Sequence, residues 1–149
     1  MPEQSDEAAW WFQAVYSAIQ QVPHGKVTSY GHIAKLLGYP KRARQVGVCL
    51  KHLPSYDASQ PDQYSFHDQN VPWQRIINSK GGISARGDNG LAASRQVQRL
   101  RDEGVQVTDA RGIEEAHVDL GSYGWFPSRL PNDSDDELSD AEIKSEESA

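Results

Sequence analysis

Residues 28–53 read TSYGHIAKLLGYPKRARQVGVCLKHL, and this stretch predicts the central motif of the fold. Its first half opens at Ser29, which can cap a helix, and ends at Gly38, a glycine placed to follow the last helical turn. After Pro40, apolar residues at helical spacing predict another helix over about residues 41–53, with basic residues on its other face. Two short helices joined by a glycine-containing turn, the second one basic, are typical of a helix-turn-helix, although ordinary helical hairpins share the pattern.

The flanking sequence predicts a mainly helical domain with a small β-hairpin. An amphipathic helix is expected before the motif, because apolar residues recur every three or four positions at Trp10, Trp11, Ala14, Val15, Ala18, Ile19 and Val22. A further helix is expected over residues 91–103, with Gly104 ending it. The glycine pair at 81–82 predicts a turn between two short strands, and other short strands are expected at 105–107 and 117–120. The residues expected to close the core are Tyr123, Trp125 and Phe126.

The net charge of −6 is distributed unevenly along the 149 residues. Residues 1–7 are short, polar and acidic, and residues 130–149 combine eight acids with one lysine and no aromatic, so both ends are expected to be disordered. Residues 8–129 hold fourteen Lys and Arg against ten Asp and Glu, a net charge of +4, and are expected to form one folded domain. Within that domain, the polar stretch 54–70 is expected to be an inserted loop that is functional, lineage-specific or disordered.

The basic residues are concentrated in the first part of this domain. No Asp or Glu occurs between Ala8 and Tyr56, whereas the same stretch contains Lys26, Lys35, Lys41, Arg42, Arg44 and Lys51. A solvated face usually mixes both signs of charge, so this segregation favours a polyanionic partner.

Other classes of protein are disfavoured by composition. No run approaches the ~18 apolar residues that span a bilayer, so no membrane partner is expected. The single cysteine, Cys49, excludes an internal disulfide, and the five histidines show no ligand spacing, so neither a metal nor a cofactor is expected.

Four stretches together resemble the O6-alkylguanine-DNA alkyltransferases: residues 23–34, 43–47, 71–81 and 98–105. The third begins Val71-Pro72-Trp73-Gln74-Arg75, which is similar to the Pro-Cys-His-Arg-Val active-site run of that family. Trp73 replaces the alkyl-accepting cysteine and Gln74 replaces its histidine, and an indole cannot accept an alkyl group because that displacement needs a thiolate. The chain therefore resembles the alkyltransferase-like proteins, which implies a winged-helix-like helix-turn-helix DNA-binding domain of the alkyltransferase C-terminal type.

The resemblance also implies DNA contacts from the helix-turn-helix. Arg44 matches the intercalating arginine finger, which fills the stack vacated by a flipped nucleotide; from the pattern alone it could instead clamp a phosphate or be solvated. Tyr30 matches the tyrosine that presses the phosphate beside the target nucleotide, with a core aromatic as the alternative. Lys41 and Arg42 are expected to contact phosphates, and Gln45 on the same helix completes the DNA-binding set.

A lesion pocket is implied around residue 73. Trp73 would offer an aromatic wall to the alkyl group. Arg86 matches an arginine that stacks on the lesion base, a contact of about 0.5–2 kcal/mol, unless it is an exposed loop charge. Glu103 matches the glutamate of the alkyltransferase proton relay, and Gln74 can still hydrogen-bond it. The residues assigned to the pocket are Pro72, Trp73, Gln74, Arg75, Asn78, Arg86 and Glu103.

One principal hypothesis and two alternatives follow. The resemblance implies a non-enzymatic sensor that flips O6-alkylguanine lesions of double-stranded DNA into the pocket and signals them to nucleotide excision repair factors, and a monomer is expected. This function and the acidic tail together favour a eukaryotic, nuclear protein. The first alternative is a helix-turn-helix DNA-binding regulator without lesion specificity. The second is a divergent alkyltransferase that uses Cys49, although no histidine or acid is suitably placed to activate its thiol.

Overall fold

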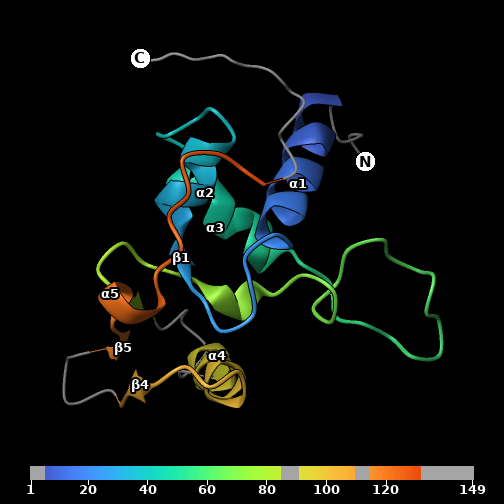
Figure 1. Cartoon of the computed structure of the whole chain (residues 1–149). Coiled ribbons are helices and arrows are strands. Elements are labelled where there is room, and N and C mark those ends of the chain that lie inside the picture. The colour runs from blue at the N-terminus through green and yellow to red at the C-terminus, as the bar shows by residue number, and fades with distance from the viewer. Residues whose placement is uncertain (1–5, 85–90, 110–114, 132–149) are drawn as a thin grey trace.

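The computed structural model describes residues 6–84, 91–109 and 115–131, and this part of the chain is mainly helical (Figure 1). The α-helices are α1 (Asp6–Ile19), α2 (Tyr30–Leu36), α3 (Ala43–Lys51), α4 (Leu91–Asp102) and α5 (Leu120–Tyr123), with a 3-10 turn, η1, at Trp73–Arg75. The strands are β1 (Thr28–Ser29), β2 (Ile76–Ile77), β3 (Gly82–Ile83), β4 (Val107–Thr108) and β5 (Ala116–Val118). None of the described helices is long and apolar enough to cross a membrane.

The predicted helix-turn-helix is confirmed in α2 and α3. Ser29 caps α2, because its side chain accepts a hydrogen bond from the backbone N–H of His32 at 3.0 Å. Gly38 ends the helix at a φ of 91°, a left-handed conformation that glycine adopts without strain. The second helix, α3, is shorter than predicted at both ends. At its start, Arg42 N–H donates to the Tyr39 carbonyl at 2.9 Å and keeps residues 39–42 in a turn.

The strands form two small sheets, and the predicted hairpin is corrected in its pairing. Strands β2 and β3 do flank the glycine turn, which is closed by Asn78 N–H donating to the Gly82 carbonyl at 3.0 Å. However, β2 pairs in parallel with β1, whereas β3 joins an antiparallel sheet of order β3-β5-β4. The strands on the two sides of the turn are only two residues long, which is too short for them to form a stable hairpin with each other. Each strand pairs instead with a segment that is distant along the chain.

Two adjoining hydrophobic clusters form the core. The first joins α1, α2 and α3 to Trp73, and the second joins α4 to the antiparallel sheet. In Figure 1 the three N-terminal helices gather at one end of the molecule, and α4, α5, β4 and β5 lie at the other. Trp10, predicted to face the core, is 47% exposed and contacts Tyr39 instead; Phe126, predicted to close the core, is also exposed. Tyr16 occupies the buried face of α1, where its hydroxyl donates to the Cys49 carbonyl at 2.6 Å.

The boundaries of the folded part are wider than the predicted 8–129. Helix α1 begins at Asp6, inside the segment expected to be disordered, and two acids in its first turn suit the positive end of the helix dipole. Leu130, assigned to the acidic tail, is 8% exposed and packs in the first cluster. The rest of the two ends expected to be disordered, 1–5 and 132–149, lies outside the described residues.

The polar stretch 54–70 is an irregular loop that projects from the body of the molecule (Figure 1). Its two ends are held together at a narrow neck. Asp68 N–H donates to the Pro54 carbonyl, and Tyr56 N–H donates to Asp68 Oδ1, each at 2.9 Å. These two bonds bring residues 54–56 and 68 together next to the site described below.

Candidate nucleic-acid interface

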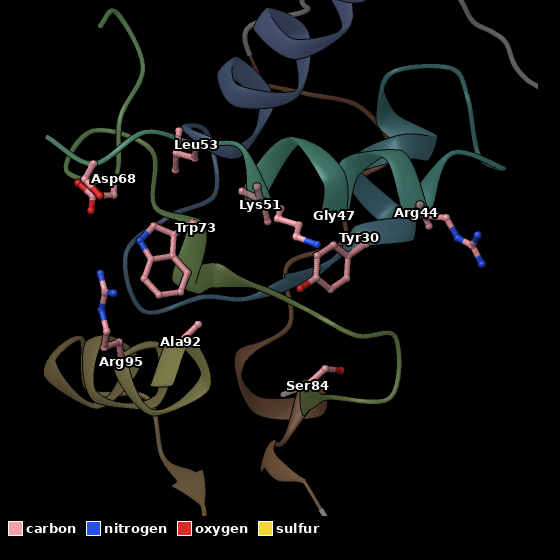
Figure 2. Close-up of a pocket in the computed structure, with 13 residues that line it drawn as sticks. Tyr30, Arg44, Gly47, Lys51, Leu53, Asp68, Trp73, Ser84, Ala92 and Arg95 are labelled. Atoms are coloured by element: carbon pink, nitrogen blue, oxygen red, sulfur yellow. The ribbon is translucent and has the colours of Figure 1, made fainter. Parts of the chain in front are cut away.

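A cavity of about 880 Å³ lies between α3, η1, the start of α4 and the neck of the 54–70 loop (Figure 2). It is lined by Tyr30, Ala43, Arg44, Gly47, Leu50, Lys51, Leu53, Ser55, Asp68, Trp73, Ser84, Ala92 and Arg95. Elements distant in sequence thus meet at one site. The cavity opens beside α3, the helix whose predicted role is to enter a DNA groove.

Tyr30 and Arg44 come from the two helices of the motif. The Tyr30 ring lies against α3 at Gly47, where a Cβ added to the glycine would be 3.8 Å from the ring, an ordinary van der Waals distance. Arg44 is exposed in the first turn of α3, and its guanidinium points outward at the end of the cavity away from the indole (Figure 2). The two predicted DNA-contacting residues therefore share one cavity with Trp73.

Trp73 forms the inner wall of the cavity from η1. Its side chain is buried, and its indole N–H finds no hydrogen-bond partner in the described part of the chain. The guanidinium carbon of Arg99 lies 5.1 Å from the centre of its ring, a cation–π contact. The Trp73 ring lines the cavity and also contacts Arg99, which does not line it. Such an aromatic wall suits contact with an apolar group inside the cavity.

The charge around the cavity is predominantly positive. Among the described lining residues, Arg44, Lys51 and Arg95 are cationic and Asp68 is anionic. Such an arrangement attracts a polyanion and raises its association rate. It agrees in sign with the acid-free stretch that precedes the loop.

Behind Trp73, a buried polar network connects η1 to the end of α4. Glu103 accepts hydrogen bonds from Gln74 Nε2 at 2.6 Å, Arg75 Nε at 3.0 Å and the Gly25 N–H at 2.8 Å. Burial alone would raise the pKa of Glu103, but the bonds from Arg75, Gly25 and Gln74, with the charge of Arg75, hold that pKa below its ordinary value. The expected bond between Gln74 and Glu103 is therefore present, and the carboxylate is fully engaged.

Most of the predicted pocket residues support the cavity and do not line it. Gln74, Arg75 and Glu103 form the network behind the indole, and Arg75 also donates to the Val22 carbonyl at 2.7 Å. Asn78 holds the glycine turn by accepting from the N–H groups of residues 80 and 82. Pro72 directly precedes η1. Arg86 lies outside the described residues.

The remaining predicted DNA contacts differ in their surroundings. Lys41 and Gln45 are exposed next to Arg44. Arg42 instead packs over the ring of Tyr39 at 4.3 Å and lies 3.8 Å from a carboxylate oxygen of Glu7. Its guanidinium is thus positioned by an aromatic face next to the start of α3.

Sequence reasoning missed several residues at this site. Arg95 and Arg99 lie one turn apart on α4, and this four-residue spacing is the signal that could have placed both near one wall. Asp68 and Ser55 reach the cavity only because the loop neck closes, which no local pattern predicts. Gln96 is buried and donates to the carbonyls of Gln74 and Ile76, fixing α4 against η1.

The chemistry available for covalent catalysis is limited. Cys49 is buried in the helical cluster, and burial raises the pKa of its thiol to about 11, so the thiol is protonated at neutral pH. Within the described ranges, no three His, Cys, Asp or Glu side chains come together as a metal site.

Comparisons with known proteins agree with this geometry. The family model of the 6-O-methylguanine DNA methyltransferase DNA-binding domain matches residues 10–105. Alkyltransferase-like protein 1 of Schizosaccharomyces pombe is 39% identical over 117 residues, 78% of this chain and 95% of its own length. A DNA base-flipping protein of Vibrio parahaemolyticus is 38% identical over 113 residues, 76% of this chain and 93% of its own length. The crystal structure of S. pombe Atl1 in complex with damaged DNA containing O6-carboxymethylguanine matches with a TM-score of 0.65 and 37% identity, covering 84% of this chain and 100% of that chain.

Proposed function

Because this chain belongs to the alkyltransferase-like proteins of the O6-methylguanine DNA methyltransferase family, we propose that it binds O6-alkylguanine lesions in duplex DNA by flipping the nucleotide into its cavity. The observation that carries the proposal is the meeting of Tyr30, Arg44 and Trp73 around one cavity beside α3. The O6 atom of guanine lies in the major groove, but an alkyl group there cannot be surrounded while the base stays stacked.

Each of the three residues has a defined part in this proposal. Arg44, exposed at the mouth of the cavity, enters the stack in place of the flipped nucleotide. Tyr30, whose ring lies against α3 at Gly47, presses on the neighbouring phosphate and keeps the nucleotide rotated outward. Trp73 contacts the base and its alkyl group from the inner wall.

Binding without alkyl transfer is the second part of the proposal. Trp73 has no nucleophilic atom for displacement, and Gln74 cannot relay a proton as a histidine can. The only cysteine, Cys49, is buried, and its thiol is protonated at neutral pH. These features support a protein that recognises the lesion and leaves it chemically unchanged.

A protein that leaves the lesion in place needs a repair system to remove it. We therefore propose that the bound, flipped lesion is presented to nucleotide excision repair factors, and that the protein works in the nucleus. The cavity and the helix-turn-helix both come from a single chain, which supports a monomer as the working form. Alkylated double-stranded DNA is the partner on which each of these proposals depends.

The test compares two fluorescent duplexes that differ by a single O6-methylguanine. The wild type should bind the lesion duplex at least tenfold more tightly, a difference of about 1.4 kcal/mol. Arg44→Ala should remove most of that preference, whereas Arg101→Ala, an arginine on α4 that does not line the cavity, should keep it. Equal binding of the wild type to both duplexes would favour a helix-turn-helix regulator without lesion specificity. Transfer of a radiolabelled methyl group to the protein would contradict binding without chemistry.

A further inference from the structure

We propose that Arg99 is a positioning residue for lesion recognition: it fixes the Trp73 indole and the neck of the 54–70 loop as one rigid wall that fits small O6 substituents. The inference rests on the proposed function and adds a determinant of which lesions bind best. Arg99 does not itself line the cavity, so it would act through Trp73 and through the loop residues that do.

The first contact is with the indole. The guanidinium carbon of Arg99 lies 5.1 Å from the centre of the Trp73 ring, within the range of an attractive cation–π interaction. The indole N–H of Trp73 donates to no acceptor in the described part of the chain, so Arg99 adds a directional contact to the apolar packing that holds the ring. A planar guanidinium can cover a ring face more completely than an ammonium group can.

The second contact is with the loop. Arg99 Nη1 donates to the backbone carbonyl of Asp68 at 3.1 Å. The same side chain therefore reaches both the inner wall and the loop neck. A hydrogen bond from a charged donor is stronger than one between neutral groups, and this one joins α4 to the loop, which α1 also holds through the bond from Gln20 to the Asn70 carbonyl.

The loop neck connects the Arg99 contact to the cavity, because Asp68, whose carbonyl Arg99 binds, also lines the cavity. The carboxylate of Asp68 accepts from Tyr56 N–H at 2.9 Å, and its backbone N–H donates to the Pro54 carbonyl at 2.9 Å. The rings of Tyr56 and His67 pack with their centres 4.7 Å apart. Ser55 and Asp68, one from each side of the neck, both line the cavity, and Asp68 faces the Trp73 side in Figure 2.

The consequence is a dependence on the size of the substituent. A methyl group makes few contacts, and a radial gap of about 0.5–1 Å already forfeits a quarter to a half of the attraction of each. Loosening the wall should therefore reduce binding of O6-methylguanine most. A larger group such as benzyl can fill a widened cavity and keep its contacts.

The experiment measures Kd by fluorescence anisotropy for the full chain on three duplexes, which carry guanine, O6-methylguanine or O6-benzylguanine at one position. The variants are Arg99→Leu, which removes both contacts, and Arg99→Lys, which keeps a cation over the ring. The matched control is Arg101→Leu, an α4 arginine that binds the Val107 carbonyl and Asp109 away from the cavity. Far-UV circular dichroism and a urea unfolding curve for each variant establish that it is folded.

Arg99→Leu should lower the preference for O6-methylguanine over guanine about fivefold and that for O6-benzylguanine less than twofold, while Arg99→Lys recovers part of the loss and Arg101→Leu causes none. Equal losses of affinity for all three duplexes in a folded variant would show that Arg99 supports DNA binding in general and not the choice of lesion, and would overturn the inference. Unchanged preferences in Arg99→Leu, or a lysine variant no better than leucine, would overturn it as well. If the wild type itself does not prefer either lesion, the proposed function fails, which is a separate outcome.

Discussion

Replacing Glu103, which directly follows α4, by alanine should destabilise the protein strongly. The Glu103 side chain is 8% exposed and holds three donors from two other segments: the turn at Gly25, and Gln74 and Arg75 of η1. Alanine would leave Arg75, whose side chain is 15% exposed, without a counter-charge, although it keeps its bond to the Val22 carbonyl.

The magnitude follows from the number and type of groups left unpaired. Removing one partner of a buried ion pair typically costs about 3–5 kcal/mol, and a buried donor without an acceptor costs about 1–3 kcal/mol. The Gly25 turn lies near the surface and can be hydrated, so the lower end, about 3 kcal/mol, is expected. Asp102→Ala is the matched control, because that neighbouring carboxylate is exposed and accepts a hydrogen bond from the exposed Gln98 amide, a pair worth less than about 0.5 kcal/mol.

Urea unfolding followed by far-UV circular dichroism at neutral pH measures the difference. With a slope of about 1–3 kcal/mol/M, the midpoint of Glu103→Ala should fall by about 1–3 M, and that of Asp102→Ala should stay nearly constant. Because the folded pKa of Glu103 lies below its ordinary 4.5, its contribution is complete above that pH and disappears as the pH falls through the folded value. The wild type should thus lose more stability on acidification than Glu103→Ala does. A loss under about 1 kcal/mol relative to the control, or equal acid sensitivity, would refute the reasoning.

Three further predictions address the turn, the tail and the altered active-site run. Gly81→Ala should cost about 2 kcal/mol or more by thermal unfolding, because its φ is 89° and an added Cβ would collide with a carbonyl of β5; Gly104→Ala, with a φ of 87° and open space around it, should cost only about 1 kcal/mol. Deleting residues 132–149, which hold eight acids and one lysine, should tighten binding to undamaged DNA at low salt and have little effect at high salt, as titrations at two ionic strengths would show. The double substitution Trp73→Cys with Gln74→His should allow stoichiometric transfer of a labelled methyl group from DNA to the introduced thiol, since Glu103 is already placed to orient the imidazole, whereas Trp73→Cys alone should transfer far more slowly.

The helix-turn-helix could be predicted from the sequence because its signals are local. Ser29 caps α2 within one turn, and Gly38 ends it through its own φ. The strand pairing could not be predicted, since β2 and β3 are two residues long and find their partners in β1 and β5, far away along the chain. The buried end at Leu130 was missed because a single leucine before an acidic run carries no periodicity.

The candidate site likewise has a part that the sequence predicted and a part that depends on long-range contacts. The resemblance of short runs brought Tyr30, Arg44 and Trp73 together, and the structure gives them one cavity. It also assigned Arg75 and Glu103 to the pocket, whereas they support its inner wall from behind. The loop neck and Arg99 depend on contacts between segments that share no local pattern, so only the folded chain reveals them.

The surroundings of Trp73 show how a site without a cysteine or a histidine can be held in a fixed shape. In an alkyltransferase the cysteine and histidine must exchange a proton, which requires titratable groups near neutral pH. Here the amide of Gln74 gives Glu103 the same kind of donor without titrating, and Arg75 with the Gly25 N–H occupies the remaining carboxylate positions. The network is therefore a fixed support for the wall that carries the indole. Recognition needs only that the cavity be preorganised, and the pairing of Trp73 with a non-titrating support meets that need, in keeping with the proposal of binding without alkyl transfer.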